Sequence, residues 1–562
     1  MNTYNYIKIL SLISISIWLT SCANPQPPSG GPPDKTPPEI LNFSPNNRTL
    51  NFNQNNIKIE FNKYMDKNKV IENIFISPIK KMNFDWNGKN LDVEFAEPLD
   101  SNTTYFFVIG TEYNDLKGNK PNDAFSIVFS TGNKLDSGKI QGIIADEKPE
   151  GTYVIAYKID EINPDTLNIN HTAPAYKTQA GMSGKFEFQA LKDGTYRIFI
   201  FKKKEKVSVY EEGNDQFGTV SSDVKVENGT SKPIMMKIGR PIDKVKPGLF
   251  TAEGLFKNQA MVSFSEPIDT FSIKNESFIL TDSLGNFIEN ASGSFISKKS
   301  ATQIILNFTK LEKDLKYIIK VNTDNSIKDT VGNAIDDTIN AAKFYSVGIN
   351  DTLAPALNRI NLKDSLTKIS LNPDFRIGFS SSIDTAQFLQ RIALKDNKKS
   401  DVPFEMNFIN SNYLKIAPKV ALNNEEWYNL KLDLKGLKSI SGISIKKDTV
   451  LKYSFKTEDR RAYSKVSGKI KTASNYDGSY VIEMINKETK HKLITKIKTK
   501  DFIFEDVPAG DYIIWGYQDS DNNGNYSSGY SFPFKFAEKF SLIKEISVKS
   551  RWNLENLIID IE

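Results

Sequence analysis

The chain has 562 residues, a formal net charge of +5 and a single cysteine. Lysines and acids are interspersed, which argues against a nucleic-acid-binding protein, because such proteins need basic residues clustered on one face. A lone cysteine excludes an internal disulfide and a thiolate-ligated metal centre. The 36 Phe and 22 Tyr residues can fill several small cores, and the length predicts several domains.

The first 22 residues combine a short cationic start, an apolar run and the cysteine. Lys8 precedes an apolar stretch from Ile9 to Leu19, and Thr20-Ser21-Cys22 follows. The stretch is shorter than the about 20 apolar residues of a spanning helix, and it has the length of a signal-peptide core. Leu-Thr-Ser-Cys resembles the lipobox of bacterial lipoproteins, which implies removal of a signal peptide (1–21) and diacylglycerol on Cys22. An ordinary secretory signal with an incidental cysteine is the alternative.

A tether rich in Pro, Gly, Ser and Asn follows the cysteine, and residues 22–37 are predicted to form an extended spacer anchored in a membrane by the lipid. Its Ser29-Gly30-Gly31-Pro32-Pro33-Asp34 stretch resembles that of Bacteroidota lipoproteins that begin with an immunoglobulin-like domain. Asp does not follow Cys22, so the resemblance implies outer-membrane residence. The sequence leaves open whether the protein faces the cell surface or the periplasm.

One repeat occurs three times after the tether. Each copy has an Asp four residues before a Pro, an alternating strand that ends in Phe with an Asp five residues later, and a Leu six residues before a Tyr. The alternation, as in Ile57-Lys58-Ile59-Glu60-Phe61, indicates half-buried antiparallel strands, and units of about 100 residues fit β-sandwiches. The repeat resembles the bacterial Ig-like domain of S-layer proteins.

The Leu-to-Tyr spacing in these repeats is typical of a tyrosine corner. We expect the hydroxyls of Tyr105, Tyr317 and Tyr428 to bond back to the backbone and fix the connection between the two sheets. This structural role is preferred to ligand contact.

A second repeat occurs twice. Ser137-Gly138-Lys139-Ile140 recurs as Ser467-Gly468-Lys469-Ile470, and a Phe-x-Phe-x-x-Leu/Val-x-x-Gly-x-Tyr-x-Ile pattern begins at Phe186 and at Phe502. Each pattern predicts two alternating strands around a turn. These repeats resemble the carboxypeptidase-regulatory or transthyretin-like sandwich, an accessory module that carries no peptidase activity.

The predicted fold is therefore all-β, a series of tandem β-sandwiches after a signal peptide and a tether. The predicted domains are Ig-like at 38–134, transthyretin-like at 135–240, Ig-like at 241–349 and 350–459, and transthyretin-like at 460–562.

Catalytic patterns are weak, and we expect no enzyme. The two histidines, His171 and His491, fall at unmatched positions of the second repeat type. A catalytic triad needs a histidine held between two partners, and a zinc site needs three or four nitrogen or sulfur ligands. Neither arrangement is indicated.

One motif could hold a cofactor, namely calcium. The stretch from Asp519 through Asp521 and Asn523 to Asn525 matches the first half of an EF-hand loop, with oxygen donors at alternate positions and Gly524 at the turn. The twelfth position is Tyr530 instead of a bidentate Glu, so a metal-free turn rich in Asp and Asn is the alternative.

Two functions follow from these patterns. The first is a lipid-anchored structural arm that binds an outer-membrane protein, with an accessory subunit of a β-barrel assembly or secretion complex as its finer form. The second is a glycan-binding lipoprotein that stacks sugars on exposed aromatic residues such as Trp86, Trp515 or Trp552.

Overall fold

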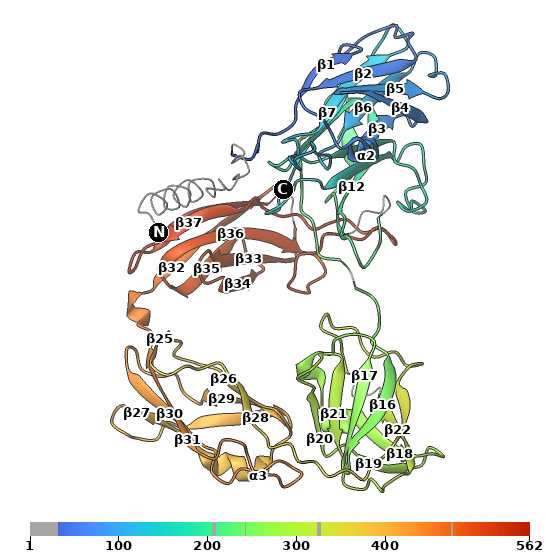
Figure 1. Cartoon of the computed structure of the whole chain (residues 1–562). Coiled ribbons are helices and arrows are strands. Elements are labelled where there is room, and N and C mark those ends of the chain that lie inside the picture. The colour runs from blue at the N-terminus through green and yellow to red at the C-terminus, as the bar shows by residue number, and fades with distance from the viewer. Residues whose placement is uncertain (1–31, 205–209, 242, 323–326, 474–475, 562) are drawn as a thin grey trace, which may run out of the picture. The chain divides into compact units, whose positions relative to one another are not determined.

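The computed structural model describes residues 32–204, 210–241, 243–322, 327–473 and 476–561 (Figure 1). The described chain is nearly all β, as predicted, and consists of paired sheets with short helices. It divides into two compact units, each made of two segments. Unit 1 contains the chain up to Ile200 and the segment Ser222–Lys237, and unit 2 contains Phe201–Ser221 and the chain from Ile238 onward. Among the described residues, no helix combines the length and apolarity needed to cross a bilayer.

Five successive pairs of sheets follow one another along the chain, and we number them modules 1 to 5. Their strands lie within residues 40–130, 138–236, 249–345, 357–457 and 464–561. The predicted domain boundaries remain predictions.

Modules 1, 3 and 4 share the strand arrangement of one of their two sheets. In each, one sheet has four antiparallel strands, with the first strand of the module at one edge: β1-β2-β5-β4, β16-β17-β21-β20 and β24-β26-β29-β28. The opposing sheets are β3-β6-β7, β19-β18-β22-β23 and β25-β31-β30-β27. The strand bounds are β1 (Ile40–Ser44), β2 (Asn56–Phe61), β3 (Ile74–Ser77), β4 (Met82–Asn87), β5 (Asn90–Phe95), β6 (Thr104–Ile109), β7 (Phe125–Ser130), β16 (Leu249–Phe256), β17 (Gln259–Phe264), β18 (Phe278–Asp282), β19 (Phe287–Asn290), β20 (Gly293–Ile296), β21 (Gln303–Asn307), β22 (Lys316–Val321), β23 (Ala341–Tyr345), β24 (Leu357–Ile360), β25 (Leu366–Ile369), β26 (Phe375–Phe379), β27 (Ile392–Asp396), β28 (Phe404–Asn410), β29 (Tyr413–Pro418), β30 (Trp427–Asp433) and β31 (Val450–Thr457).

Modules 2 and 5 share a different arrangement, in which the last strand pairs in parallel with the first. The sheets are β11-β8-β15 and β35-β32-β38, each opposed by a sheet that contains β10-β9-β12 or β34-β33-β36-β37. The bounds are β8 (Gly138–Ile144), β9 (Tyr153–Lys158), β10 (Tyr176–Gln179), β11 (Lys185–Leu191), β12 (Gly194–Lys202), β13 (Gln216–Thr219), β14 (Val224–Val226), β15 (Ile234–Met236), β32 (Ser464–Thr472), β33 (Ser479–Asn486), β34 (Lys492–Ile497), β35 (Asp501–Val507), β36 (Gly510–Asp519), β37 (Lys544–Val548) and β38 (Leu554–Ile561).

Helices are short and lie between strands. They are α2 (Lys67–Glu72), α3 (Thr385–Phe388) and four described 3₁₀ turns at Thr270–Ser272, Asn275–Ser277, Leu389–Arg391 and Arg460–Ala462. Asp66 caps α2 by accepting a hydrogen bond from the backbone N–H of Lys69, which satisfies one of the free N–H groups of the first turn.

The three predicted tyrosine corners are confirmed. In each Ig-type module the tyrosine hydroxyl accepts a hydrogen bond from the backbone N–H five residues upstream: 2.8 Å from Asp100 to Tyr105, 3.0 Å from Glu312 to Tyr317 and 3.0 Å from Asn423 to Tyr428. The three rings are buried, so each corner fixes a loop against the core.

Candidate metal centre and module junctions

The predicted calcium loop begins where strand β36 of module 5 ends. The structure places the carboxylates of Asp519 and Asp521 beside that of Glu538, with one oxygen from each within 4.8 Å of the others. Glu538 is distant from the motif in sequence and comes close because the chain from 520 to 537 loops back to the strand end. Sequence reasoning missed it, because an EF-hand pattern looks for the final acid at Tyr530.

The charges of this cluster are partly balanced by lysines. Asp519 is buried, and its Oδ2 lies 2.6 Å from Lys496 Nζ, while Asp521 Oδ2 lies 3.5 Å from Lys535 Nζ. The other oxygen of Asp519, Oδ1, is buried without a hydrogen-bond partner. That oxygen is available to a cation.

Glu538 organises the loop. It accepts hydrogen bonds from the backbone N–H of Ser520 at 2.6 Å and of Ser527 at 3.0 Å, and burial raises its pKa. Asn523 and Asn525 are exposed, and Asn523 Oδ1 accepts the backbone N–H of Asn525, as in a turn rich in Asp and Asn.

The loop therefore unites two of the four predicted ligands with one that was not predicted. Oxygen donors of this kind suit a hard divalent cation, although calcium needs six to eight oxygens and the two lysines already supply positive charge. Calcium at Asp519 and Asp521 remains a prediction, with Glu538 as the third ligand in place of the asparagines.

The other predicted functional residues are placed as follows. Cys22 and the signal peptide lie outside the described residues. His171 and His491 are exposed. Of the proposed sugar-stacking residues, Trp552 is 71% exposed, whereas Trp515 is buried and donates its indole N–H to Glu483, so Trp515 offers no face to a sugar.

Module 1 and the part of module 2 that belongs to unit 1 share an apolar junction. In strand β6 of module 1, Tyr105, Phe107 and Ile109 point into the core of that module, while Phe106 and Val108 on the opposite face are also buried. The ring of Phe106 lies 6.4 Å from that of Tyr176 in strand β10 of module 2. Both faces of β6 are therefore covered, which explains its unbroken apolar run.

A buried glutamine completes this junction. Gln179 Oε1 accepts backbone N–H groups of Thr111 at 2.5 Å and Glu112 at 3.2 Å, and its Nε2 donates to Asn73 Oδ1 at 3.1 Å. Gly110 gives the amide room, since a Cβ there would lie 2.0 Å from Gln179 Oε1. The junction is thus closed by packing and by hydrogen bonds.

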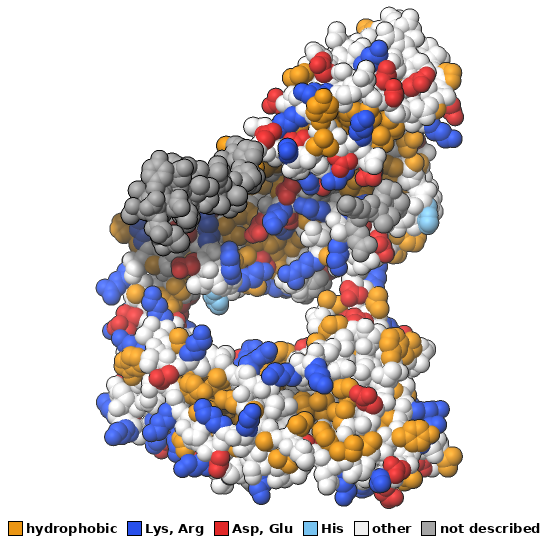
Figure 2. Space-filling model, viewed as in Figure 1, with side chains coloured by type: hydrophobic (Ala, Val, Ile, Leu, Met, Phe, Trp, Pro, Cys, Tyr) orange, Lys and Arg blue, Asp and Glu red, His pale blue; other side chains and the backbone are white. Residues whose placement is uncertain are grey.

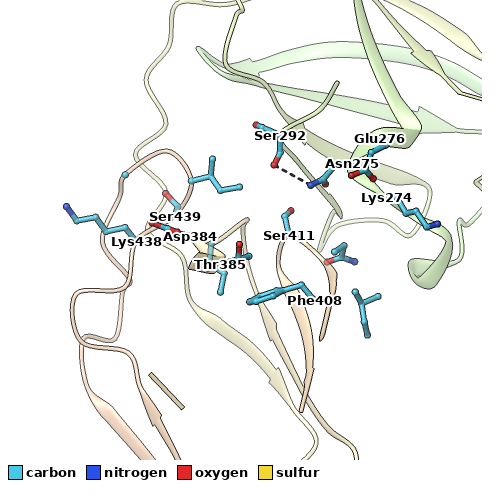
Figure 3. Close-up of a pocket in the computed structure, with 15 residues that line it drawn as sticks. Lys274, Asn275, Glu276, Ser292, Asp384, Thr385, Phe408, Ser411, Lys438 and Ser439 are labelled. Carbon is cyan, nitrogen blue, oxygen red and sulfur yellow. Dashed lines mark hydrogen bonds between the residues drawn. The ribbon is translucent and has the colours of Figure 1, made fainter. Parts of the chain in front are cut away.

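Modules 3 and 4, both in unit 2, meet through buried serines beside an open cleft. Ser382 Oγ donates to Asn307 Oδ1 at 2.8 Å, and Ser411 Oγ donates to the carbonyl of Ser294 at 2.9 Å. The adjacent cleft has a volume of about 760 Å³ and is lined from both modules (Figure 3). Its charged lining residues are Lys274, Glu276, Asp384 and Lys438.

Modules 4 and 5 are joined by a short 3₁₀ turn held by ion pairs. Arg460 Nε lies 3.0 Å from Glu458, and its Nη1 lies 3.4 Å from Asp506 of module 5. The hydroxyl of Tyr463 donates to Glu458 at 2.7 Å. The connection is therefore supported by side chains from both modules.

Residues 34–131 and 351–457, which cover modules 1 and 4, match the bacterial Ig-like domain family. These two modules are similar in sequence to bacterial Ig-like domains. Module 3 resembles them in strand order and in its tyrosine corner.

Three solved structures that match the chain share 8–12% of its sequence, with TM-scores of 0.14 to 0.16. The N-terminal part of the bacterial S-layer protein SbsC is 12% identical, with 38% of this chain and 45% of that chain covered and a TM-score of 0.16. A longer SbsC structure is 10% identical, covering 93% of this chain and 68% of that chain with a TM-score of 0.15. The Bacillus anthracis TIE protein is 8% identical, covering 95% and 76% with a TM-score of 0.14. No curated protein matches the chain.

Proposed function

We propose that the protein is a lipid-anchored, non-catalytic arm that holds a protein partner at the outer membrane. The observation that carries this proposal is Gln179, which is buried at the junction of modules 1 and 2 with three hydrogen bonds. A junction of this kind keeps two sandwiches in one orientation, as a positioning arm requires and as a flexible linker does not.

Exposed apolar side chains support a binding role. On module 3, six large apolar residues have more than half of their surface exposed. Figure 2 shows apolar side chains among the polar ones on the side of this module that it draws. Such residues are common at protein interaction sites when they gather on one surface. They are Phe250, Phe271, Leu284, Phe287, Val331 and Tyr345.

The finer proposal is an accessory subunit of an outer-membrane β-barrel complex for assembly or secretion. Affinity purification of the tagged full chain from membranes dissolved in a mild detergent tests it, and we expect an outer-membrane protein to be recovered in constant proportion. Recovery of the chain alone, at several detergent strengths, would contradict the proposal.

The anchor is tested separately. Labelled palmitate should be incorporated into the wild-type chain and not into Cys22→Ser, and the variant should leave the membrane fraction. A control change at the neighbouring serine, Ser21→Ala, keeps a small residue before the cysteine and should still be lipidated. Protease treatment of intact cells then decides which side of the membrane the arm faces.

A further inference from the structure

Modules 1 and 3 contain the same framework of two aspartates. In module 1, Asp115 begins a turn in which its carboxylate accepts the backbone N–H and the side-chain amide of Asn119, and that amide also donates to the carbonyl of Asp34. Module 3 repeats the arrangement with Asp329, Asn333 and Asp243. The two aspartates of each pair therefore occupy equivalent places.

In module 1 a lysine side chain lies between the two aspartates. Lys63, two residues after the end of strand β2, has its Nζ 2.7 Å from Asp34 Oδ2 and 3.2 Å from Asp115 Oδ2. Asp115 Oδ2 makes this contact while still accepting the amide of Asn119 at 2.9 Å. The two aspartates of module 1 therefore bind one positive charge while the hydrogen bonds of the Asp115–Asn119 turn remain.

Module 3 has a glutamate where module 1 has the lysine. Glu266 also stands two residues after the end of its strand, β17, and one carboxylate oxygen from each of Asp243, Glu266 and Asp329 lies within 4.8 Å of the others. Within the described parts of the chain, no lysine or arginine forms an ion pair with any of the three. Glu266 Oε1 is buried and has no hydrogen-bond partner.

These contacts leave three negative charges around a position that a cation fills in module 1. Burial, and then the charges of Asp243 and Asp329, raise the pKa of Glu266. Module 4 keeps only the opening aspartate, Asp351, since Ser381 stands at the position of Glu266 and Ser439 replaces the turn aspartate.

We propose that Asp243, Glu266 and Asp329 of module 3 form a calcium site. Three carboxylates offer oxygen ligands alone, which favours a hard divalent cation, and water or backbone carbonyls complete the six to eight ligands that calcium takes. The ion would join the opening segment at Asp243 to strand β17 and the 329–333 turn, as Lys63 joins the equivalent segments of module 1. This proposal does not depend on the proposed function.

The test uses the full chain, stripped with chelator and titrated with calcium chloride by calorimetry. Because the Asp519 loop is a second candidate, binding is measured in a background that carries Asp519→Asn. In that background we expect one calcium site, weakened at least tenfold by Glu266→Gln, and a melting transition raised by calcium. No calcium binding in this background would overturn the proposal, as would equal affinity with and without Glu266→Gln.

A lysine swap separates loss of a ligand from loss of the fold. Glu266→Lys supplies the cation that module 1 contains, so the variant should melt higher than the wild type in chelator and should show no calcium site in the same background. A variant that melts no higher in chelator, or that still binds calcium, would contradict the proposed equivalence of Glu266 and Lys63. Glu253→Lys in strand β16 of the same module, which makes the same charge change at an exposed position, is the matched control and should retain the calcium site.

Discussion

Replacing Gln179 should open the junction between modules 1 and 2. Gln179→Met keeps the length of the side chain and removes its amide, so the buried N–H of Thr111 and the buried Oδ1 of Asn73 lose their partners. Each unsatisfied buried group costs about 1–3 kcal/mol. The more exposed N–H of Glu112 can turn to water, so the total loss from the two buried groups should be about 2–6 kcal/mol.

Hydrogen exchange on the full chain measures this loss locally, which matters because a chain of several modules does not unfold in a single two-state step. At tenfold per 1.4 kcal/mol, amides of β6 and β10 that exchange through opening of the junction should exchange about 30-fold to about 20,000-fold faster. Gln141→Met is the matched control, because Gln141 is exposed and bonds only to Glu187 among its described side-chain contacts. Equal exchange in the two variants would refute the reasoning.

Three further predictions concern the tyrosine corner of module 3, Lys63 of module 1 and Glu266 of module 3. Tyr317→Phe leaves the N–H of Glu312 without its acceptor and should lower the local stability of module 3 by about 1–2 kcal/mol, as measured by hydrogen exchange of its amides in the full chain. Tyr345→Phe, at an exposed ring, should change this stability little. Lys63→Glu should create a calcium-dependent melting transition in module 1, and Lys63→Met should not. Because the pKa of Glu266 is raised above its ordinary 4.5, the folded state binds the proton more tightly than the unfolded chain. In chelator, stability present below about pH 4.5 should therefore fall as pH rises through the raised pKa, and calcium or Glu266→Gln should remove that fall. A melting temperature of module 3 that is flat with pH in chelator would contradict this last prediction.

The sequence predicted the features that repeat. Period-two alternation predicts the strands, and the spacing from Leu99 to Tyr105 predicts the corner hydrogen bond, because both depend on residues close together in the chain. The continuous apolar run from Tyr105 to Ile109 indicates a strand that is buried on both faces, because a strand buried on one face alternates apolar and polar residues. The partner that covers Phe106 could not be predicted, because it comes from another module.

The two acidic clusters were not predicted in full from the sequence, because their members come from distant parts of the chain. Glu538 joins Asp519 only because a loop returns to the strand end, and no fixed spacing describes that loop. Glu266 could have been found by aligning the three repeats, since Lys63, Glu266 and Ser381 all stand two residues after the strand-ending Phe. What the alignment alone does not provide is the convergence of Asp243 and Asp329 on that position.

The parallel pairing of β15 with β8 has a mechanical consequence for module 2. Ile234 lies opposite Gly142 and Met236 opposite Ile144, so the chain enters the sheet at Gly138 and leaves it about 20 Å further along the same strand direction. Tension applied between these two points pulls the strands past each other, and the hydrogen bonds between them share the load instead of opening one by one. Module 2 should therefore resist stretching along its strands better than a sheet whose first and last strands run antiparallel and peel apart from one end.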